Sequence, residues 1–122
     1  MKENPTLYID GFGHKVWRLS NGKLHREDGP AMETRNAHKH WYRNGKLHRT
    51  DGPAREYSTG LNEWWVYNRL HRLNGPAREN IGGKKCNNEW WIRGKQYTYE
   101  DWVRKICKKG LITEEEAFLE LV

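Results

Sequence analysis

The sequence has little of what membrane, secreted and disulfide-rich proteins need. Its apolar runs are only a few residues long, as in Trp64-Trp65-Val66, so no segment is expected to cross a membrane as a helix. Residues 1–10 lack the apolar stretch of a secretory signal, and we therefore expect a cytoplasmic protein. Cysteine is nearly absent. Cys86 and Cys107 stand 21 residues apart, which predicts neither a disulfide framework nor a CxxC site.

Apolar residues are also scarce, but aromatic residues are not. Hydrophobic residues make up 35% of the 122 residues and charged residues 31%, a balance that on its own favours disorder. The 7 Trp, 6 Tyr and 2 Phe indicate the opposite, because each buried aromatic side chain removes roughly 150–250 Å² from water. We therefore expect one folded domain over residues 1–122, with a small core built mainly on tryptophan.

The charge is positive and unevenly distributed. The net charge is +6, yet residues 98–122 hold 4 Lys or Arg against 6 Asp or Glu. A basic body with a mildly acidic tail indicates an anionic partner. The alternative is a solvated basic surface without a partner.

The sequence repeats itself with a step of 23 residues. Residues 21–31 (NGKLHREDGPA) return at 44–54 (NGKLHRTDGPA) and, degraded, at 67–77 (YNRLHRLNGPA). An incomplete fourth copy follows at 90–95 (WWIRGK). An aromatic element precedes each of the first three copies: Trp17, then Trp41-Tyr42, then Trp64-Trp65.

A unit of this length is too short for a pair of helices and suits two short strands joined by turns. Asn-Gly and Asp-Gly-Pro are both turn signals. The predicted fold is mainly β: a repeat-built antiparallel meander sheet of 23-residue hairpin repeats over 7–97, with two short C-terminal helices over 98–122. The strands are expected at 41–43, 54–57, 64–67, 77–79 and 90–93.

The first C-terminal helix is predicted from its cap and its apolar face. Thr98 and Asp101 resemble a capping box, and Gly110 is a stop signal. One helical face collects Trp102, Val103, Ile106 and Cys107. A second capping box at 113–116 opens the last predicted helix.

The segments NGKLHREDGPA and WYRNGKLHRTDGPA resemble a repeat of bacteriophage and giant-virus proteins. More loosely, they are similar to MORN-type repeats and to an antitoxin family with a Tyr-x-x-Asn-Gly-Lys signature. The resemblance covers about residues 16–97. It implies an all-β repeat array, a viral or mobile-element origin, the host cytoplasm as location, and a role against host defence. It supplies no catalytic residue.

The His-Arg pair occurs once in each of the three copies. The residues are His25, Arg26, His48, Arg49, His71 and Arg72. A catalytic or metal site needs a single set of residues that converge on one point. A fold built from repeats instead needs the same turn in every copy. We therefore expect these residues to satisfy carbonyls and the neighbouring Asp within a structural turn, and no metal is predicted. Phosphate binding through Arg is the alternative.

Side-chain alternation along the strands predicts two aromatic rows. The first row is expected to form the core and contains Trp41, Trp64, Trp90, Val66 and Ile92. The opposite row contains Tyr42, Trp65 and Trp91, joined by Arg55, Arg78 and Arg93. Arginine interleaved with tryptophan suits a nucleotide or a nucleic-acid strand, through stacking and a guanidinium fork. The alternatives are cation–π packing that only stabilises the sheet, or a row covered by helices or loops.

The link at 80–89 is longer than its counterpart in the previous copy. It carries Lys84 and Lys85 after Gly82-Gly83, without the spacing of a P-loop. We place the two lysines at the rim of the expected binding surface; an ordinary hairpin tip is the alternative.

These features predict a binding protein that is not an enzyme, since no nucleophile with its base, no paired carboxylates and no cofactor fingerprint is visible. The first hypothesis is sequestration of an anionic ligand, a nucleotide or a cyclic nucleotide immune signal. The second is an inhibitor that covers a host defence protein, such as a nucleic-acid-binding nuclease complex. Long nucleic acid is less favoured by the acidic tail. Open sheet edges would permit a homo-oligomer.

Overall fold

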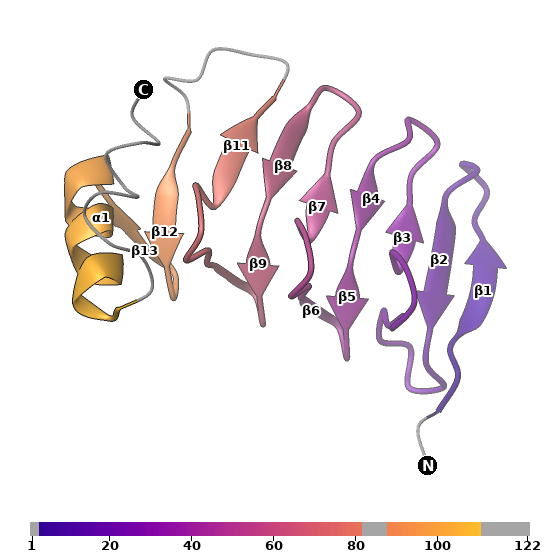
Figure 1. Cartoon of the computed structure of the whole chain (residues 1–122). Helices are drawn as coiled ribbons and strands as arrows, with labels where there is room; N and C mark the ends of the chain where they lie inside the picture. Colours follow the sequence, from indigo (N-terminus) through magenta and orange to yellow (C-terminus); the bar gives the residue numbers. More distant parts are fainter. Residues whose placement is uncertain (1–2, 82–87, 111–122) are drawn as a thin grey trace.

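The computed structural model describes residues 3–81 and 88–110, and it is mainly antiparallel β (Figure 1). Seven strands form one sheet in the order β1-β2-β3-β4-β7-β8-β11, with every neighbouring pair antiparallel. Their bounds are Thr6–Ile9, Lys15–Arg18, Met32–Glu33, Lys39–His40, Arg55–Glu56, Leu61–Glu63 and Arg78–Asn80. The predicted meander is therefore confirmed.

Three further two-stranded hairpins lie at one end of this sheet. They are β5 (Tyr42–Arg43) with β6 (Lys46–Leu47), β9 (Trp65–Val66) with β10 (Arg69–Leu70), and β12 (Trp90–Ile92) with β13 (Lys95–Tyr97). Figure 1 shows β5 and β9 continuing from β4 and β8. A complete repeat thus contains four short strands, where the sequence predicted two.

The extra strands arise because the chain changes partners at the first Trp of each copy. The Trp41 amide donates to the Ala54 carbonyl at 2.7 Å, and the Trp41 carbonyl accepts from the His48 amide at 3.0 Å. Trp64 makes the same two bonds 23 residues later, to Ala77 and His71. One strand therefore pairs within the sheet before the Trp and within a hairpin after it.

Successive hairpins are also bonded to one another. A backbone amide in the turn of one hairpin donates to the Leu carbonyl of the preceding copy, at 2.8–2.9 Å: Gly45 to Leu24, Asn68 to Leu47, and Gly94 to Leu70. Each added copy thus satisfies backbone groups of the one before it, as expected of a repeat array.

Within the repeats, the buried positions are alanine, leucine and isoleucine rather than the predicted tryptophans. Ala31, Ala54 and Ala77 are 0% exposed. Leu47, Leu70 and Ile92 are also buried, whereas Trp41, Trp64, Trp90 and Val66 are only partly buried. Trp41 and Trp64 are covered on one side by charged groups, because the guanidinium carbons of Arg49 and Arg72 lie 4.0 and 3.7 Å from their ring centroids. Of the predicted core row, Ile92 alone is buried, at 4% exposed.

The helix α1 (Tyr99–Lys108) follows the last hairpin and packs against it. Thr98 caps it by accepting a hydrogen bond from the Asp101 amide, as the sequence predicted. Trp102 and Ile106 are buried against Ile92. The second predicted helix lies outside the described residues. Within 3–81 and 88–110, no helix is long and apolar enough to span a membrane.

The turn at 34–38 gives a prediction about stability. Ala37 adopts φ = 66°, whereas the corresponding residues of the neighbouring turns, Gly13 and Gly60, have φ = 84° and 96°. The left-handed conformation costs a non-Gly residue about 1–2 kcal/mol, and the added freedom of the unfolded chain offsets about 0.4–1 kcal/mol. We therefore expect Ala37→Gly to raise the free energy of unfolding by about 0.5–1 kcal/mol in urea titrations. Gly60→Ala is the matched control, with the opposite sign expected; a lower stability of Ala37→Gly would contradict the argument.

Candidate binding face

A row of polar residues crosses four neighbouring strands of the sheet, β4, β7, β8 and β11. The strand register sets His40 opposite Arg55, Arg55 opposite Glu63, and Glu63 opposite Arg78. A β-bridge then sets Arg78 opposite Glu89. Directly opposite residues project from the same face of a sheet. These five residues therefore form one continuous row, called the charged row below.

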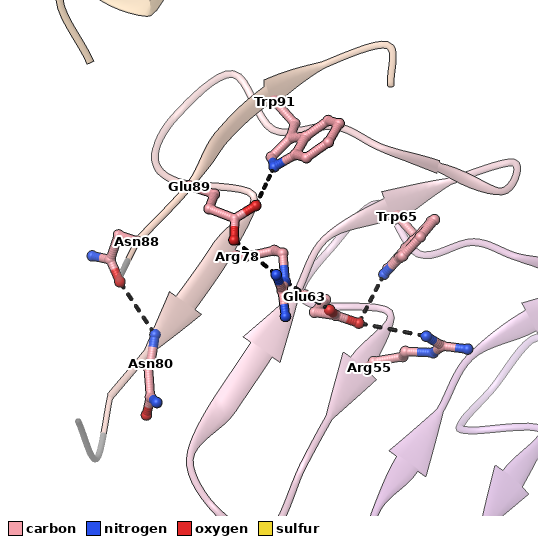
Figure 2. A network of polar contacts seen from close by, with 8 residues as sticks. All are labelled: Arg55, Glu63, Trp65, Arg78, Asn80, Asn88, Glu89 and Trp91. Atoms are coloured by element: carbon pink, nitrogen blue, oxygen red, sulfur yellow. Dashed lines mark hydrogen bonds and ion pairs between the residues drawn. The ribbon is translucent and has the colours of Figure 1, made fainter. Parts of the chain in front are cut away.

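Glu63 is the centre of the charged row. It is 6% exposed and accepts a hydrogen bond from Arg78 Nε at 2.9 Å. Its other oxygen accepts from the Trp65 indole at 3.2 Å and lies 3.6 Å from Arg55 Nη1 (Figure 2). One buried carboxylate thus holds two guanidinium groups and an indole.

Glu89 repeats this arrangement one copy later. Its carboxylate accepts from Arg78 Nη1 at 2.7 Å and from the Trp91 indole at 2.9 Å (Figure 2). The spacing is the same as before, because Trp91 follows Glu89 by two residues as Trp65 follows Glu63. Arg78 is therefore clamped between two carboxylates.

Arg55 is less fully paired. Its guanidinium carbon lies 5.5 Å from the centroid of the Trp65 ring, and within the described residues its buried Nε has no hydrogen-bond partner. Burial opposes the charge, but a hydrogen bond to Tyr42 and the nearby Tyr57 and Glu63 outweigh it and raise the pKa of Arg55. Tyr42, Arg55 and Trp65 are thus neighbours.

The predicted row of Tyr42, Arg55, Trp65, Arg78 and Trp91 is brought together, but its charge differs from the expectation. Two carboxylates accompany the two arginines, so these four side chains carry no net charge. Glu63 and Glu89 were missed by the sequence analysis. The signal was present in the sequence, since a residue two before Trp65 or Trp91 faces the same side of an extended chain.

The other predicted binding residues lie elsewhere or are not described. Arg93 occupies the turn of the last hairpin with φ = 51°, and its amide donates to His71 Nδ1 at 3.0 Å. The strand ends at Ile92, so alternation does not carry Arg93 onto the charged row. Lys84 and Lys85 lie outside the described residues. The helix α1 packs on the side of β12 that carries Trp90 and Ile92, opposite Trp91.

The three His-Arg pairs occupy equivalent positions and join neighbouring copies. His25, His48 and His71 accept through Nδ1 from the amides of Asn44, Tyr67 and Arg93, at 3.0–3.2 Å. Arg49 donates through Nε to Asp51 at 2.9 Å and through Nη1 to the Pro53 carbonyl at 3.0 Å. Arg26 and Arg72 make the same contacts in their own copies.

These contacts explain the glycine of the Asp-Gly-Pro turn. A Cβ added at Gly52 would lie 2.7 Å from Arg49 Cζ, and one at Gly75 would lie 2.7 Å from Arg72 Cζ. The guanidinium occupies the space that a side chain would need. The motif therefore encodes a packed turn, in which the arginine sits between the glycine and the Trp ring.

The described residues contain no group of three or more His, Cys, Asp or Glu that could hold a metal ion. Cys107 is a partly buried free thiol, and Cys86 lies outside the described ranges. Comparison with known protein families, curated proteins and solved structures found no match to this chain.

His48→Ala is expected to act on stability. The side chain is 7% exposed and stacks on Tyr67 with ring centroids 4.0 Å apart, besides its bond to the Tyr67 amide. Leaving that amide without its acceptor costs roughly 1–3 kcal/mol, which lowers the melting temperature of a domain of this size by several degrees. Calorimetric melting checks this, with His14→Ala as a control: His14 is less buried than His48 and accepts the Arg35 amide at 2.9 Å near the surface, so its loss should matter less. An unchanged melting curve would remove the structural role.

Proposed function

We propose that the protein is a non-enzymatic binding protein whose Trp/Arg face contacts a partner protein. This face consists of Tyr42, Arg55, Trp65, Arg78 and Trp91. The observation that carries the proposal is the pairing of Arg78 with both Glu63 and Glu89, at 2.9 and 2.7 Å. An anion would have to compete with carboxylates already in place, whereas a protein surface can use the face as it stands.

The composition of the face supports this class of partner. Trp, Tyr and Arg are the residues most enriched among those that dominate protein–protein affinity. The indole of Trp65 is held by Glu63 and that of Trp91 by Glu89, so little rotamer freedom is lost when a partner covers them. The net charge of +6 favours a partner with an acidic surface. The resemblance to viral repeats makes a host defence protein the natural partner class.

The test is co-purification from host cells that express the tagged protein. A Trp at the centre of an interface is worth about 2 kcal/mol or more, so Trp65→Ala should weaken partner binding about 30-fold or more. Phe12→Ala is the matched control, because Phe12 is an aromatic side chain 75% exposed in a turn outside the face. Full capture by a folded Trp65→Ala protein would refute the proposal.

Sequestration of a nucleotide is the second candidate, supported by Arg55. Its guanidinium lies over Trp65 and is the less fully paired of the two arginines. Calorimetry against mono-, di- and cyclic nucleotides separates the two candidates: a ligand bound tighter than about 100 μM, roughly −5.5 kcal/mol, would favour sequestration. Glu63→Gln removes the competing charge and should tighten such a ligand, while a protein partner adapted to the native face should bind more weakly.

A further inference from the structure

A second surface lies on the side of the strands opposite Tyr42, Trp65 and Trp91. Trp17, Trp41 and Trp64 each line a shallow pocket, with volumes of about 410, 400 and 690 Å³. Each pocket is bounded by the His-Arg loop of its own copy, and the second and third also by the loop of the copy before. At the fourth copy Trp90 packs instead against Tyr99 of α1, with ring centroids 5.1 Å apart. In the described part of the array, Trp17, Trp41 and Trp64 therefore line three open pockets in series.

The spacing of these pockets is fixed by the sheet. Trp17 belongs to β2, Trp41 follows β4 and Trp64 follows β8, and each of these strands is two places from the next in the sheet order. Adjacent strands lie about 4.7–4.9 Å apart, so successive pockets repeat about every 9.4–9.8 Å. A polyproline II helix advances about 3.1 Å per residue, or about 9.3 Å for each three-residue turn. A peptide in this conformation presents the same face to every pocket.

The arginines of the three His-Arg loops are already paired with carboxylates. Arg26 donates to Asp28 at 3.1 Å, Arg49 to Asp51 at 2.9 Å, and Arg72 to Glu79 at 3.1 Å. A polyanion would therefore have to displace these carboxylates along the row. This distinguishes the surface from a track for a polyanion.

The polar groups that remain in the pockets include donors. His48 lines the second pocket and His71 the third, whereas Nε2 of His25 lies 3.8 Å from the Glu27 carboxylate. Because Nδ1 of each ring accepts a backbone N–H, the proton of the neutral imidazole is on Nε2. A polyproline II segment has no internal hydrogen bonds, and a proline-rich one offers carbonyl acceptors with few backbone donors. Indole rings for the pyrrolidines and donors for the carbonyls are the features of aromatic grooves that bind proline-rich peptides.

We propose that the row of Trp17, Trp41 and Trp64 binds a proline-rich peptide segment in the polyproline II conformation, one turn to each pocket. This surface is separate from the Trp/Arg face, and the proposal does not rest on the function proposed above. A partner protein carrying such a segment can occupy both surfaces or this one alone.

The test is an NMR titration of the full chain with a twelve-residue polyproline peptide. We expect saturable shifts of the indole N–H signals of Trp17, Trp41 and Trp64, with those of Trp65 and Trp91 unmoved. A nine-residue peptide should bind about tenfold or more tighter than a three-residue one, because later turns bind intramolecularly. No saturation at about 1 mM peptide, shifts confined to Trp65 and Trp91, or equal binding of a Gly-Ser peptide of the same length would each overturn the proposal.

Two variants locate the peptide on the row. Thr50 is exposed and lines both the second and the third pocket, so Thr50→Tyr blocks the groove without touching the core. We expect it to weaken the peptide about tenfold, the equivalent of about 1.4 kcal/mol. Trp65→Ala, on the opposite face, should leave the affinity unchanged. Unaltered binding by Thr50→Tyr, or lost binding by a folded Trp65→Ala protein, would refute the placement.

Discussion

Glu63→Ala should lower the free energy of unfolding by about 2–4 kcal/mol, because it removes the shared partner of two guanidinium groups inside the sheet. Glu63 is 6% exposed and sits 2.9 Å from Arg78 Nε and 3.6 Å from Arg55 Nη1. The Trp65 indole also loses its acceptor. The side chains of Arg55 and Arg78 are 29% and 34% exposed, so partial rehydration keeps the cost below that of a fully enclosed charge.

Urea titrations of Glu63→Ala and Glu56→Ala give the measurement and its control. Glu56 accepts from Arg49 at 3.2 Å with a side chain that is 36% exposed, so its loss should cost about 1 kcal/mol or less. Glu63→Gln should fall between the two, since the amide oxygen can still accept one of the three donors. If Glu63→Ala were no more destabilising than Glu56→Ala, the charged row would not be the structural centre of the sheet.

The sequence correctly predicted the features that depend on patterns within one or two repeats, namely the turns, the strand faces and the helix cap. The 23-residue step correctly placed the three His-Arg turns at equivalent sites. Alternation correctly put Trp65 and Arg78 on a common face, because both lie within regular strands. The cap at Thr98 was equally local, and the helix begins where the capping pattern predicts.

The parts that it missed depend on partners distant in the chain. The bend at Trp41 exists because its amide bonds to Ala54 and its carbonyl to the His48 amide, and a strand pattern alone does not contain that exchange. Arg93 was misplaced for a related reason. Its amide bonds to His71, 22 residues earlier, so the chain turns before alternation can continue. Glu63 was missed because an acidic residue in a strand is expected to face solvent. Its burial depends on Arg55 and Arg78, which lie opposite it on the two neighbouring strands.

The second large effect is loss of stability in mild acid, through His40. Its ring is 8% exposed, and within the described residues its Nδ1 makes no hydrogen bond. Burial first, then the charges of Arg55 and His38, lower the pKa of His40 from 6.5 to about 4, with Glu63 opposing. Tyr57 packs edge-on against the ring, at 5.7 Å between centroids.

The sign follows from where the proton binds. Between pH 6.5 and about 4 the unfolded chain holds a proton on this imidazole that the folded chain does not. The stability contributed by neutral His40 is therefore complete above pH 6.5 and is lost as the pH falls toward 4. At about 1.4 kcal/mol per pH unit the loss amounts to roughly 2–3 kcal/mol. Burial lowers the pKa of His48 and His71 in the same direction, which adds to the slope.

His40→Val isolates the contribution of His40 to the pH dependence of stability. Valine is a suitable replacement because Val16 occupies the equivalent position on the same face of the sheet. Val16 faces Met32, and Met32 faces His40, so Val16 is the counterpart of His40 two strands away. Urea titrations of both proteins at pH 7, 6, 5 and 4 should show the wild type losing roughly 2–3 kcal/mol more than the variant over this interval. The remaining slope of the variant measures the other histidines and the carboxylates. Parallel curves for the two proteins would mean that His40 is protonated in the folded state or open to water, and the burial argument would fail.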